Sequence, residues 1–329
     1  MACRSTHFNR IPKGNGGIVL ISTRDAFGKT LAKLGHENKN LVALSADLGT
    51  ATRLENFRKQ HPERFFEIGI AECNMISIAS GLSEHGYKVF ISSFASFLTG
   101  KYDVIRVSIG YSSAPVVMVG SHAGLAIGKD GVTQMGLEDI ALMRAIPNML
   151  VLQPATPVEA AQITQYLVET NLEHPVYLRI GRQPTEEVLP PDYKFDFGKG
   201  CVIKEGSDVT LFSSGCILSE VLKAVESLEN QQISCRVVNL STIKPIDEDI
   251  IIESAKMTKA LVAIEDHSII GGLGSAIADV LVQHYPAKLI KIGVNDCFPE
   301  SGPPDLLWDK YGLSSSKITN RIISFVEQA

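Results

Sequence analysis

One carboxylate, Glu72, is placed where a proton-exchanging group would be useful. It follows the apolar run 66–70 and precedes Met75, Ile76 and Ala79, which have helical spacing, so we expect it where a strand ends and a helix begins. Apolar walls at such a junction would desolvate the carboxylate, an environment suited to proton exchange. The residues around Glu72 leave a second interpretation open, a helix-terminal glutamate that interacts only with the helix dipole.

Other polar residues stand after apolar runs that are typical of buried strands. Asp47, His122 and Arg182 each follow such a run, and we expect Arg24 just outside the first helix. Because ligands of parallel sheets bind beyond the carboxyl ends of the strands, these side chains and Glu72 are expected at one edge. Two arginines and a histidine there suit an anionic group, since a guanidinium matches phosphate in a bidentate way. Exposed ion pairs and a structural histidine are the alternatives.

The elements that must position these residues alternate between short apolar strands and amphipathic helices. This pattern predicts an α/β fold with two doubly wound, mostly parallel sheets, covered on both faces by helices. A helix is expected from about Ser22, with Ser22 or Thr23 as its cap. The strands are expected at 41–44, 89–91, 115–119, 150–152 and 175–180, and then at 209–212, 235–239, 260–264 and 289–294.

A break in this periodicity divides the chain. Residues 184–200 contain three prolines and several charges, and we interpret them as an interdomain linker. Residues 1–17 read as a polar lead-in, 18–183 as the first domain, and 201–329 as a smaller second domain.

Composition argues against several classes of partner. Apolar residues make up 45% and charged residues 20% of the 329 residues, as in ordinary globular proteins. The net charge of −5 without a basic cluster argues against nucleic acid, and no apolar run is long enough to span a membrane. Six scattered cysteines have neither disulfide-framework nor metal-ligand spacing, so we expect no metal site and a cytoplasmic location.

One glycine motif resembles a nucleotide-binding fingerprint but fails its requirements. Residues 272–277 follow a strand and open a helix, yet the sixth position is Ile277, and no acidic residue stands about 20 positions later. We expect these glycines to allow close approach of the helix to neighbouring backbone.

Two sets of motifs resemble the transketolase family over nearly the whole chain. Glu72 in Gly-Ile-Ala-Glu, followed by Asn-Met and then by Phe94 and Phe97, resembles the pyrimidine-binding domain, and the segments RVVNLSTIKPID and EDHSIIGGLG resemble the C-terminal domain. The resemblance implies thiamine diphosphate as cofactor and Glu72 as the catalytic residue that contacts N1′ of its aminopyrimidine. It also implies that Phe94 and Phe97 pack on that ring, with Asp47 and Leu48 nearby.

The resemblance also implies a site for an anionic sugar. Arg24 and Arg182 match the two phosphate-binding arginines, and His122 and Asp130 keep the family's eight-residue spacing, the histidine for the substrate phosphate and the aspartate for a hydroxyl. There are two departures. Gln134 stands where the family often has a substrate-binding histidine, and Ala51 takes the place of a phosphate-binding serine.

A larger departure concerns the metal. The family holds Mg²⁺ and diphosphate with Gly-Asp-Gly and a later Asn, whereas the nearest string in these 329 residues is Lys129-Asp130-Gly131. The resemblance therefore implies an N-terminal partner subunit that carries the diphosphate-binding domain and the Mg²⁺. Self-association to a dimer would then give an α2β2 assembly.

The leading hypothesis from the sequence is therefore the C-terminal subunit of a split transketolase. It would transfer a two-carbon ketol unit between a ketose and an aldose that end in phosphate or a similar anion. Two alternatives remain: the β subunit of a 2-oxoacid dehydrogenase, which would not need Arg24 or Arg182, and a non-catalytic relative, which Gln134 and Ala51 favour.

Overall fold

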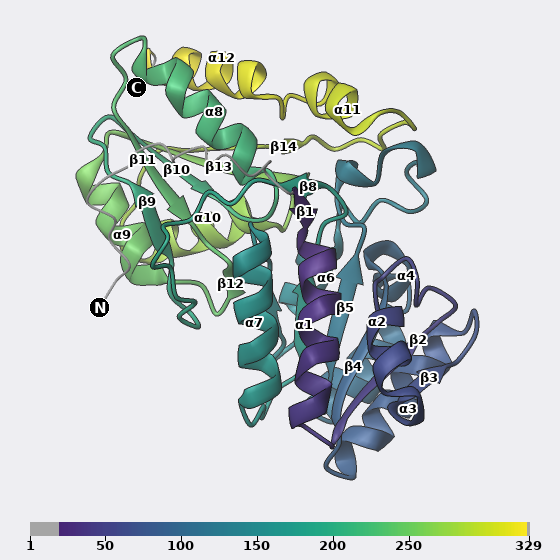
Figure 1. The fold of residues 1–329 in the computed structure, drawn as a ribbon. Helices are drawn as coiled ribbons and strands as arrows, with labels where there is room; N and C mark the ends of the chain where they lie inside the picture. Colours follow the sequence, from purple (N-terminus) through teal and green to yellow (C-terminus); the bar gives the residue numbers. More distant parts are fainter. Residues whose placement is uncertain (1–19, 328–329) are drawn as a thin grey trace.

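The computed structural model describes residues 20–327, so the predicted polar lead-in at 1–17 lies outside the described residues. Its first part is built on a seven-stranded sheet with the order β12-β6-β7-β5-β4-β2-β3 (Figure 1). Six of these strands are mutually parallel: β2 (Leu41–Ser45), β3 (Phe65–Glu67), β4 (Lys88–Phe94), β5 (Val117–Ser121), β6 (Leu150–Leu152) and β7 (Val176–Arg179).

The second part is built on a five-stranded sheet with the order β14-β13-β10-β11-β9. Its parallel strands are β10 (Val209–Ser213), β11 (Cys235–Asn239), β13 (Ala260–Ser268) and β14 (Leu289–Val294), and β9 (Cys201–Lys204) is antiparallel. The prediction of two mostly parallel α/β sheets is confirmed. The third predicted strand was placed two residues too early, since β5 ends at Ser121, directly before His122.

Helices cover the sheets on both faces. In Figure 1, α1 and α7 lie side by side against the larger sheet, and α8 and α12 pack together over the smaller one. The helices of the first part are α1 (Thr23–Glu37), α2 (Glu55–Gln60), α3 (Glu72–Glu84), α4 (Ala95–Thr99), α5 (Tyr102–Val104), α6 (Asp139–Ala145) and α7 (Pro157–Glu169), with the short helices η1 (Pro62–Arg64), η2 (Ile105–Tyr111) and η3 (Leu125–Asp130). Those of the second part are α8 (Leu218–Glu229), α9 (Glu248–Met257), α10 (Leu273–His284), α11 (Pro304–Lys310) and α12 (Ser315–Val326).

Alternation along β2 shows how the sheet separates two apolar layers. Val42 and Leu44 pack into the core that contains Met75 of α3, whereas Leu41 and Ala43 pack into the core that contains Phe27 of α1. Successive strand residues point to opposite faces, so a strand that is buried on both faces is apolar throughout.

The start of α1 corrects one expectation. Ser22 accepts a hydrogen bond from the Asp25 backbone and the Asp25 side chain accepts one from Ser22 N–H, a capping box that sets the helix start at Thr23. Arg24 therefore lies inside the first turn of α1, and the expectation that it lies just outside the helix was wrong.

Two short pairings were not expected. The strand β12 (Thr242–Lys244) comes from the second part of the chain but pairs antiparallel with β6, so it extends the first sheet. Pro184 and Thr185, at the start of the predicted linker, form β8 and pair with β1 (Ile21–Ser22). The two parts therefore share a sheet as well as an apolar core. Within residues 20–327, no helix combines the length and apolarity needed to cross a membrane.

Candidate active site

The predicted site residues gather at the carboxyl edge of the first sheet. Asp47 lies two residues after β2, Phe94 ends β4, His122 follows β5 and Arg182 lies three residues after β7. Asp47 and His122 adopt φ values of 61° and 58°, a left-handed conformation that is uncommon for residues other than glycine. Ser113, Asn148 and Gln232 share this conformation away from the predicted edge, so the φ values alone do not identify the site.

Glu72 is the first residue of α3, and its side chain is buried with 8% exposure. Ser93, the penultimate residue of β4, donates a hydrogen bond from its hydroxyl to one carboxylate oxygen of Glu72 at 3.1 Å. The strand β3 ends at Glu67, so a four-residue loop separates it from the helix. The carboxylate is therefore held at the junction that the sequence predicted.

Aromatic rings line the same edge. The rings of Phe94 and Phe97 are stacked with centroids 5.3 Å apart, and Phe94 also lies 4.0 Å from the His122 ring. Because Phe94 directly follows Ser93, the end of β4 carries both a stacked ring and the hydroxyl that holds the Glu72 carboxylate. The rings suit a planar aromatic ligand, and the Glu72 carboxylate suits an ionisable nitrogen on it.

His122 is fixed between two partners. Its Nε2 lies 3.1 Å from an Arg24 terminal nitrogen and its Nδ1 lies 2.8 Å from the Ser121 hydroxyl. A guanidinium only donates, so Nε2 accepts, and Nδ1–H donates to Ser121. The ring is therefore neutral. In this arrangement His122 orients Arg24, whose terminal nitrogen also donates to Ala51 O at 2.8 Å.

A field of positive charge surrounds these two residues. Burial, together with the charges of Arg24, Arg182 and Arg53, lowers the pKa of His122 to about 3. Burial and the charge of Arg53 lower the pKa of Arg24 to about 10, and Arg182 contributes in the same direction. The Arg24 Nε atom is buried without a hydrogen-bond partner in the described part of the chain. An anion bound here would relieve the repulsion among these groups.

We expect His122 to make the stability of the folded chain depend on pH. Its pKa is about 3 in the folded state and about 6.5 in the unfolded chain, so the unfolded chain binds the additional proton between these values. The contribution is fully present above pH 6.5 and is lost as pH falls toward 3. Urea unfolding of His122→Gln between pH 6.5 and 4 should show a shallower loss than wild type, by up to about 1.4 kcal/mol per pH unit. The exposed His36→Gln should follow wild type, and equal slopes for His122→Gln would contradict the neutral ring.

The other predicted site residues form no hydrogen bond with Glu72 in the described part of the chain. Arg182 and Asp130 form an exposed ion pair at 3.3 Å, so the arginine head is accessible to a ligand. Gln134 is half-buried, and its backbone N–H donates to Gly131 O. Asp47 and Leu48 line a cavity of about 350 Å³ that also includes Gly49, Thr50, Ala51, Glu55, Arg58, Phe65 and Glu67.

Three residues of the site were missed from the sequence: Ser93, Ser121 and Arg53. Ser93 and Ser121 are polar residues at the carboxyl ends of apolar strands, the same signal that identified His122, so it could have found them. Arg53 forms a 2.6 Å ion pair with Asp25 of the capping box. No sequence pattern indicated that pairing, because it depends on how the turn before α2 packs on α1.

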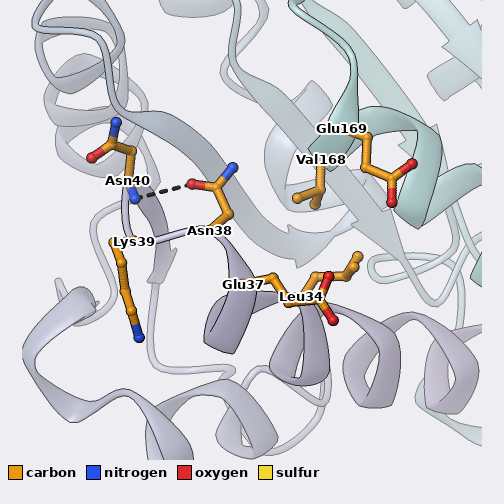
Figure 2. Close-up of a pocket in the computed structure, with 7 residues that line it drawn as sticks. All are labelled: Leu34, Glu37, Asn38, Lys39, Asn40, Val168 and Glu169. Carbon is orange, nitrogen blue, oxygen red and sulfur yellow. Dashed lines mark hydrogen bonds between the residues drawn. The ribbon is translucent and has the colours of Figure 1, made fainter.

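A second cavity lies at the opposite end of the sheet. It has a volume of about 460 Å³ and lies between the C-terminal ends of α1 and α7, just before β2 begins (Figure 2). Its lining residues are Leu34, Glu37, Asn38, Lys39, Asn40, Val168 and Glu169, and the side chain of Asn38 accepts from the Asn40 backbone. Because this cavity is at the amino ends of the strands, we do not assign the function to it.

The glycine motif at 272–277 has a structural role. The buried carboxylate of Glu265 accepts hydrogen bonds from the backbone of Leu273 at 2.7 Å and Gly274 at 3.0 Å. A Cβ at Gly272 would lie 2.0 Å from a Glu265 oxygen, so close approach explains that glycine. The helix terminus that a nucleotide phosphate would need is therefore occupied by a carboxylate.

Two family models cover most of the chain. The transketolase pyrimidine-binding domain matches residues 20–187, and the transketolase C-terminal domain matches residues 198–318.

Three known proteins are similar over nearly their whole length. A putative transketolase C-terminal section from Methanocaldococcus jannaschii is 42% identical over 91% of this chain and 95% of its own. A 6-deoxy-6-sulfo-D-fructose transketolase subunit from Clostridium sp. strain MSTE9 is 38% identical over 90% of this chain and 91% of its own. A solved structure described as a split gene transketolase, inactive beta4 tetramer, has 44% identity and a TM-score of 0.85 over 94% of this chain and 98% of its own. The chain therefore belongs to the transketolase family, as a C-terminal section made of a pyrimidine-binding domain and a transketolase C-terminal domain.

Proposed function

We propose that this chain is the C-terminal subunit of a two-chain, thiamine diphosphate-dependent transketolase. It would transfer a two-carbon ketol unit between a ketose and an aldose that carry a terminal phosphate or a similar anion. The observation that carries the proposal is the combination at one sheet edge of a buried carboxylate, stacked aromatic rings and a cluster of cations. A binding module would have no need of this set of groups together.

The residues at the edge fit the aminopyrimidine end of the cofactor. Glu72 offers a buried carboxylate oriented by Ser93, and Phe94 and Phe97 offer flat apolar surface next to it. We assign Asp47 and Leu48 to the same ring because they follow β2, which pairs with β4, and because Leu48 packs on the apolar cluster that contains Phe94. When bound, thiamine diphosphate supplies the nucleophilic carbon that carries the two-carbon unit.

Within this arrangement the chain's own residues control a proton and hold the substrate. Glu72 would exchange a proton with N1′ of the aminopyrimidine, and Ser93 would keep its carboxylate in place. Arg24, oriented by His122, and Arg182 would bind the anionic tail of the sugar. Asp130 would accept from a sugar hydroxyl, and Gln134 would lie near the reacting end.

A second chain is part of the proposal. Among residues 20–327, no three His, Cys, Asp or Glu side chains gather as a metal site would require, and the sequence contains no Gly-Asp-Gly. We infer that an N-terminal subunit with the diphosphate-binding domain holds diphosphate and Mg²⁺. The names of the similar proteins, a C-terminal section, a subunit and a split gene product, support this division. We propose a dimer of this chain with two partner chains.

We expect the purified chain alone to show no binding of thiamine diphosphate with Mg²⁺ in titration calorimetry at micromolar protein. Adding the N-terminal subunit should produce Mg²⁺-dependent binding and ketol transfer, because the diphosphate ligands arrive with it. Tight Mg²⁺-dependent binding by this chain alone would overturn the two-chain proposal. A complex that binds the cofactor but transfers no ketol unit would instead support the non-catalytic alternative.

A further inference from the structure

A loop of the first domain is held from the second domain. Residues 122–136, which we call the substrate loop, connect β5 to the region before α6 and carry His122, Asp130 and Gln134. We propose that Asp266, on β13 of the C-terminal domain, is a positioning residue that fixes the substrate loop in its substrate-binding conformation. Hydrogen bonds between the two domains support the anchoring of the loop. The effect of that anchoring on substrate binding rests on the proposed function.

The contact between the domains is direct and buried. Asp266 Oδ1 accepts a hydrogen bond from the backbone N–H of Leu125 at 2.9 Å, and both residues are almost fully buried. The carboxylate therefore satisfies one of the orphan donors at the start of η3. Gly124 has a φ of +77°, and a Cβ at that position would lie 2.3 Å from Asp266 Oδ2. The carboxylate and the loop backbone thus fit together only with glycine at 124.

Arg179 joins the far end of the loop to the backbone of Asp266. One of its terminal nitrogens donates to Asp266 O at 2.9 Å and to Gly136 O at 2.8 Å, and Gly124 N–H donates to Gly136 O at 2.8 Å. Arg179 is itself held by a buried ion pair with Asp139 at 2.8 Å. The backbone between 124 and 136 is therefore closed at its base, and Asp266 anchors the residues that lead from His122 to Asp130.

The second domain also covers the outer side of the loop. The helix α11 packs on η3, and Gly302 N–H donates to Gly128 O at 3.5 Å. Ser268, two residues after Asp266 on β13, donates its backbone N–H to Leu137 O at 2.8 Å. Contacts from the C-terminal domain thus add to those that the first domain makes to its own loop, which gives the C-terminal domain a role in substrate binding.

The neighbouring carboxylate provides a matched control. Glu265 precedes Asp266 on β13, is equally buried, and points to the other side of the strand, where it caps α10 within the second domain. Removing either carboxylate leaves buried N–H groups unsatisfied, so both variants are destabilising. Of the two substitutions, only Asp266→Ala removes a hydrogen bond to the substrate loop.

The first test uses the chain by itself and is independent of catalysis. Hydrogen–deuterium exchange followed by NMR should show the Leu125 amide exchanging at least about tenfold faster in Asp266→Ala than in wild type, since its acceptor is lost. In Asp266→Asn the amide oxygen can still accept, so protection should be largely retained. Glu265→Ala should expose the Leu273 amide and leave Leu125 protected. Unchanged exchange at Leu125 in Asp266→Ala would overturn the anchoring.

The second test uses the complex reconstituted with the N-terminal subunit. For a phosphorylated ketose, Asp266→Ala should raise KM about tenfold with kcat within about twofold, and Asp266→Asn should restore KM. Glu265→Ala should leave KM unchanged. If Asp266→Ala does not fold, Gly124→Ala disturbs the same contact from the loop and should give the same change in KM. The positioning role would be overturned if Asp266→Ala changed kcat and left KM unchanged. It would also be overturned if Glu265→Ala and Asp266→Ala had equal KM values. A wild-type complex without any transfer activity would overturn the proposed function and leave the exchange result intact.

Discussion

Glu72→Gln is expected to slow deuterium exchange at C2 of thiamine diphosphate in the complex by roughly 100- to 10,000-fold. The substitution keeps the shape of the side chain and an oxygen that can accept the hydrogen bond from Ser93, but it removes the carboxylate that we propose exchanges a proton. Exchange at C2 reports activation of the cofactor before any sugar binds, so effects on substrate affinity do not enter. NMR of the quenched cofactor measures the rate directly.

The control for this experiment lies on the same helix. Glu84 is an exposed carboxylate at the last position of α3, so Glu84→Gln makes the same chemical change far from the carboxyl edge of the sheet. The complex with Glu84→Gln should exchange deuterium at C2 of the cofactor at the wild-type rate. Assembly with the partner and cofactor binding should persist in both variants. If Glu72→Gln binds the cofactor and exchanges at the wild-type rate, the role assigned to Glu72 is wrong.

The strand ends were predictable because the first sheet is parallel and buried on both faces. Such strands are short apolar runs, so the polar residue after each run is visible in the sequence, and parallel strands bring these residues to one edge. Asp47, His122 and Arg182 were found in this way, and the structure places them there. Their assignment to cofactor and substrate remains a prediction.

Contacts between residues far apart in the sequence were not predictable. The pairing of β12 with β6 and the bond from Leu125 to Asp266 join segments that local periodicity treats as independent. The misplacement of Arg24 outside α1 had a local cause. Ser22 and Thr23 were both acceptable caps, and the reciprocal bonds between Ser22 and Asp25 decided between them.

Arg24→Ala should lower kcat/KM for a ketose with an anionic tail by about ten- to 150-fold, which corresponds to roughly 1.5–3 kcal/mol for one charge-assisted contact. Arg24 is 9% exposed and lies among other cations, so a bound anion there would be largely desolvated and its contact strong. Arg182 is half-exposed and already paired with Asp130, so Arg182→Ala should fall at the lower end of this range.

The chemistry of the tail is tested by comparing donors on the reconstituted complex. Phosphate and sulfonate each offer three oxygens to the same N–H groups. Activity on phosphorylated and on sulfonated ketoses should therefore fall in Arg24→Ala and Arg182→Ala. The name of the similar Clostridium subunit includes a sulfonated sugar, which makes a sulfonated ketose a necessary member of the panel. The ratio of kcat/KM for the two anions in the wild-type complex then identifies the preferred class.

An uncharged ketose such as erythrulose separates substrate recognition from structural support. Because it has no anionic tail, its kcat/KM should change little in Arg24→Ala and Arg182→Ala, and the exposed Arg321→Ala on α12 should leave every donor unaffected. Arg24 also contacts Ala51 and His122, so its loss could disturb the protein without any effect on an anion. Equal losses on charged and neutral donors would mean that these arginines hold the site together and do not recognise the substrate. A loss confined to the charged donors would assign the cationic cluster to the sugar's anionic tail.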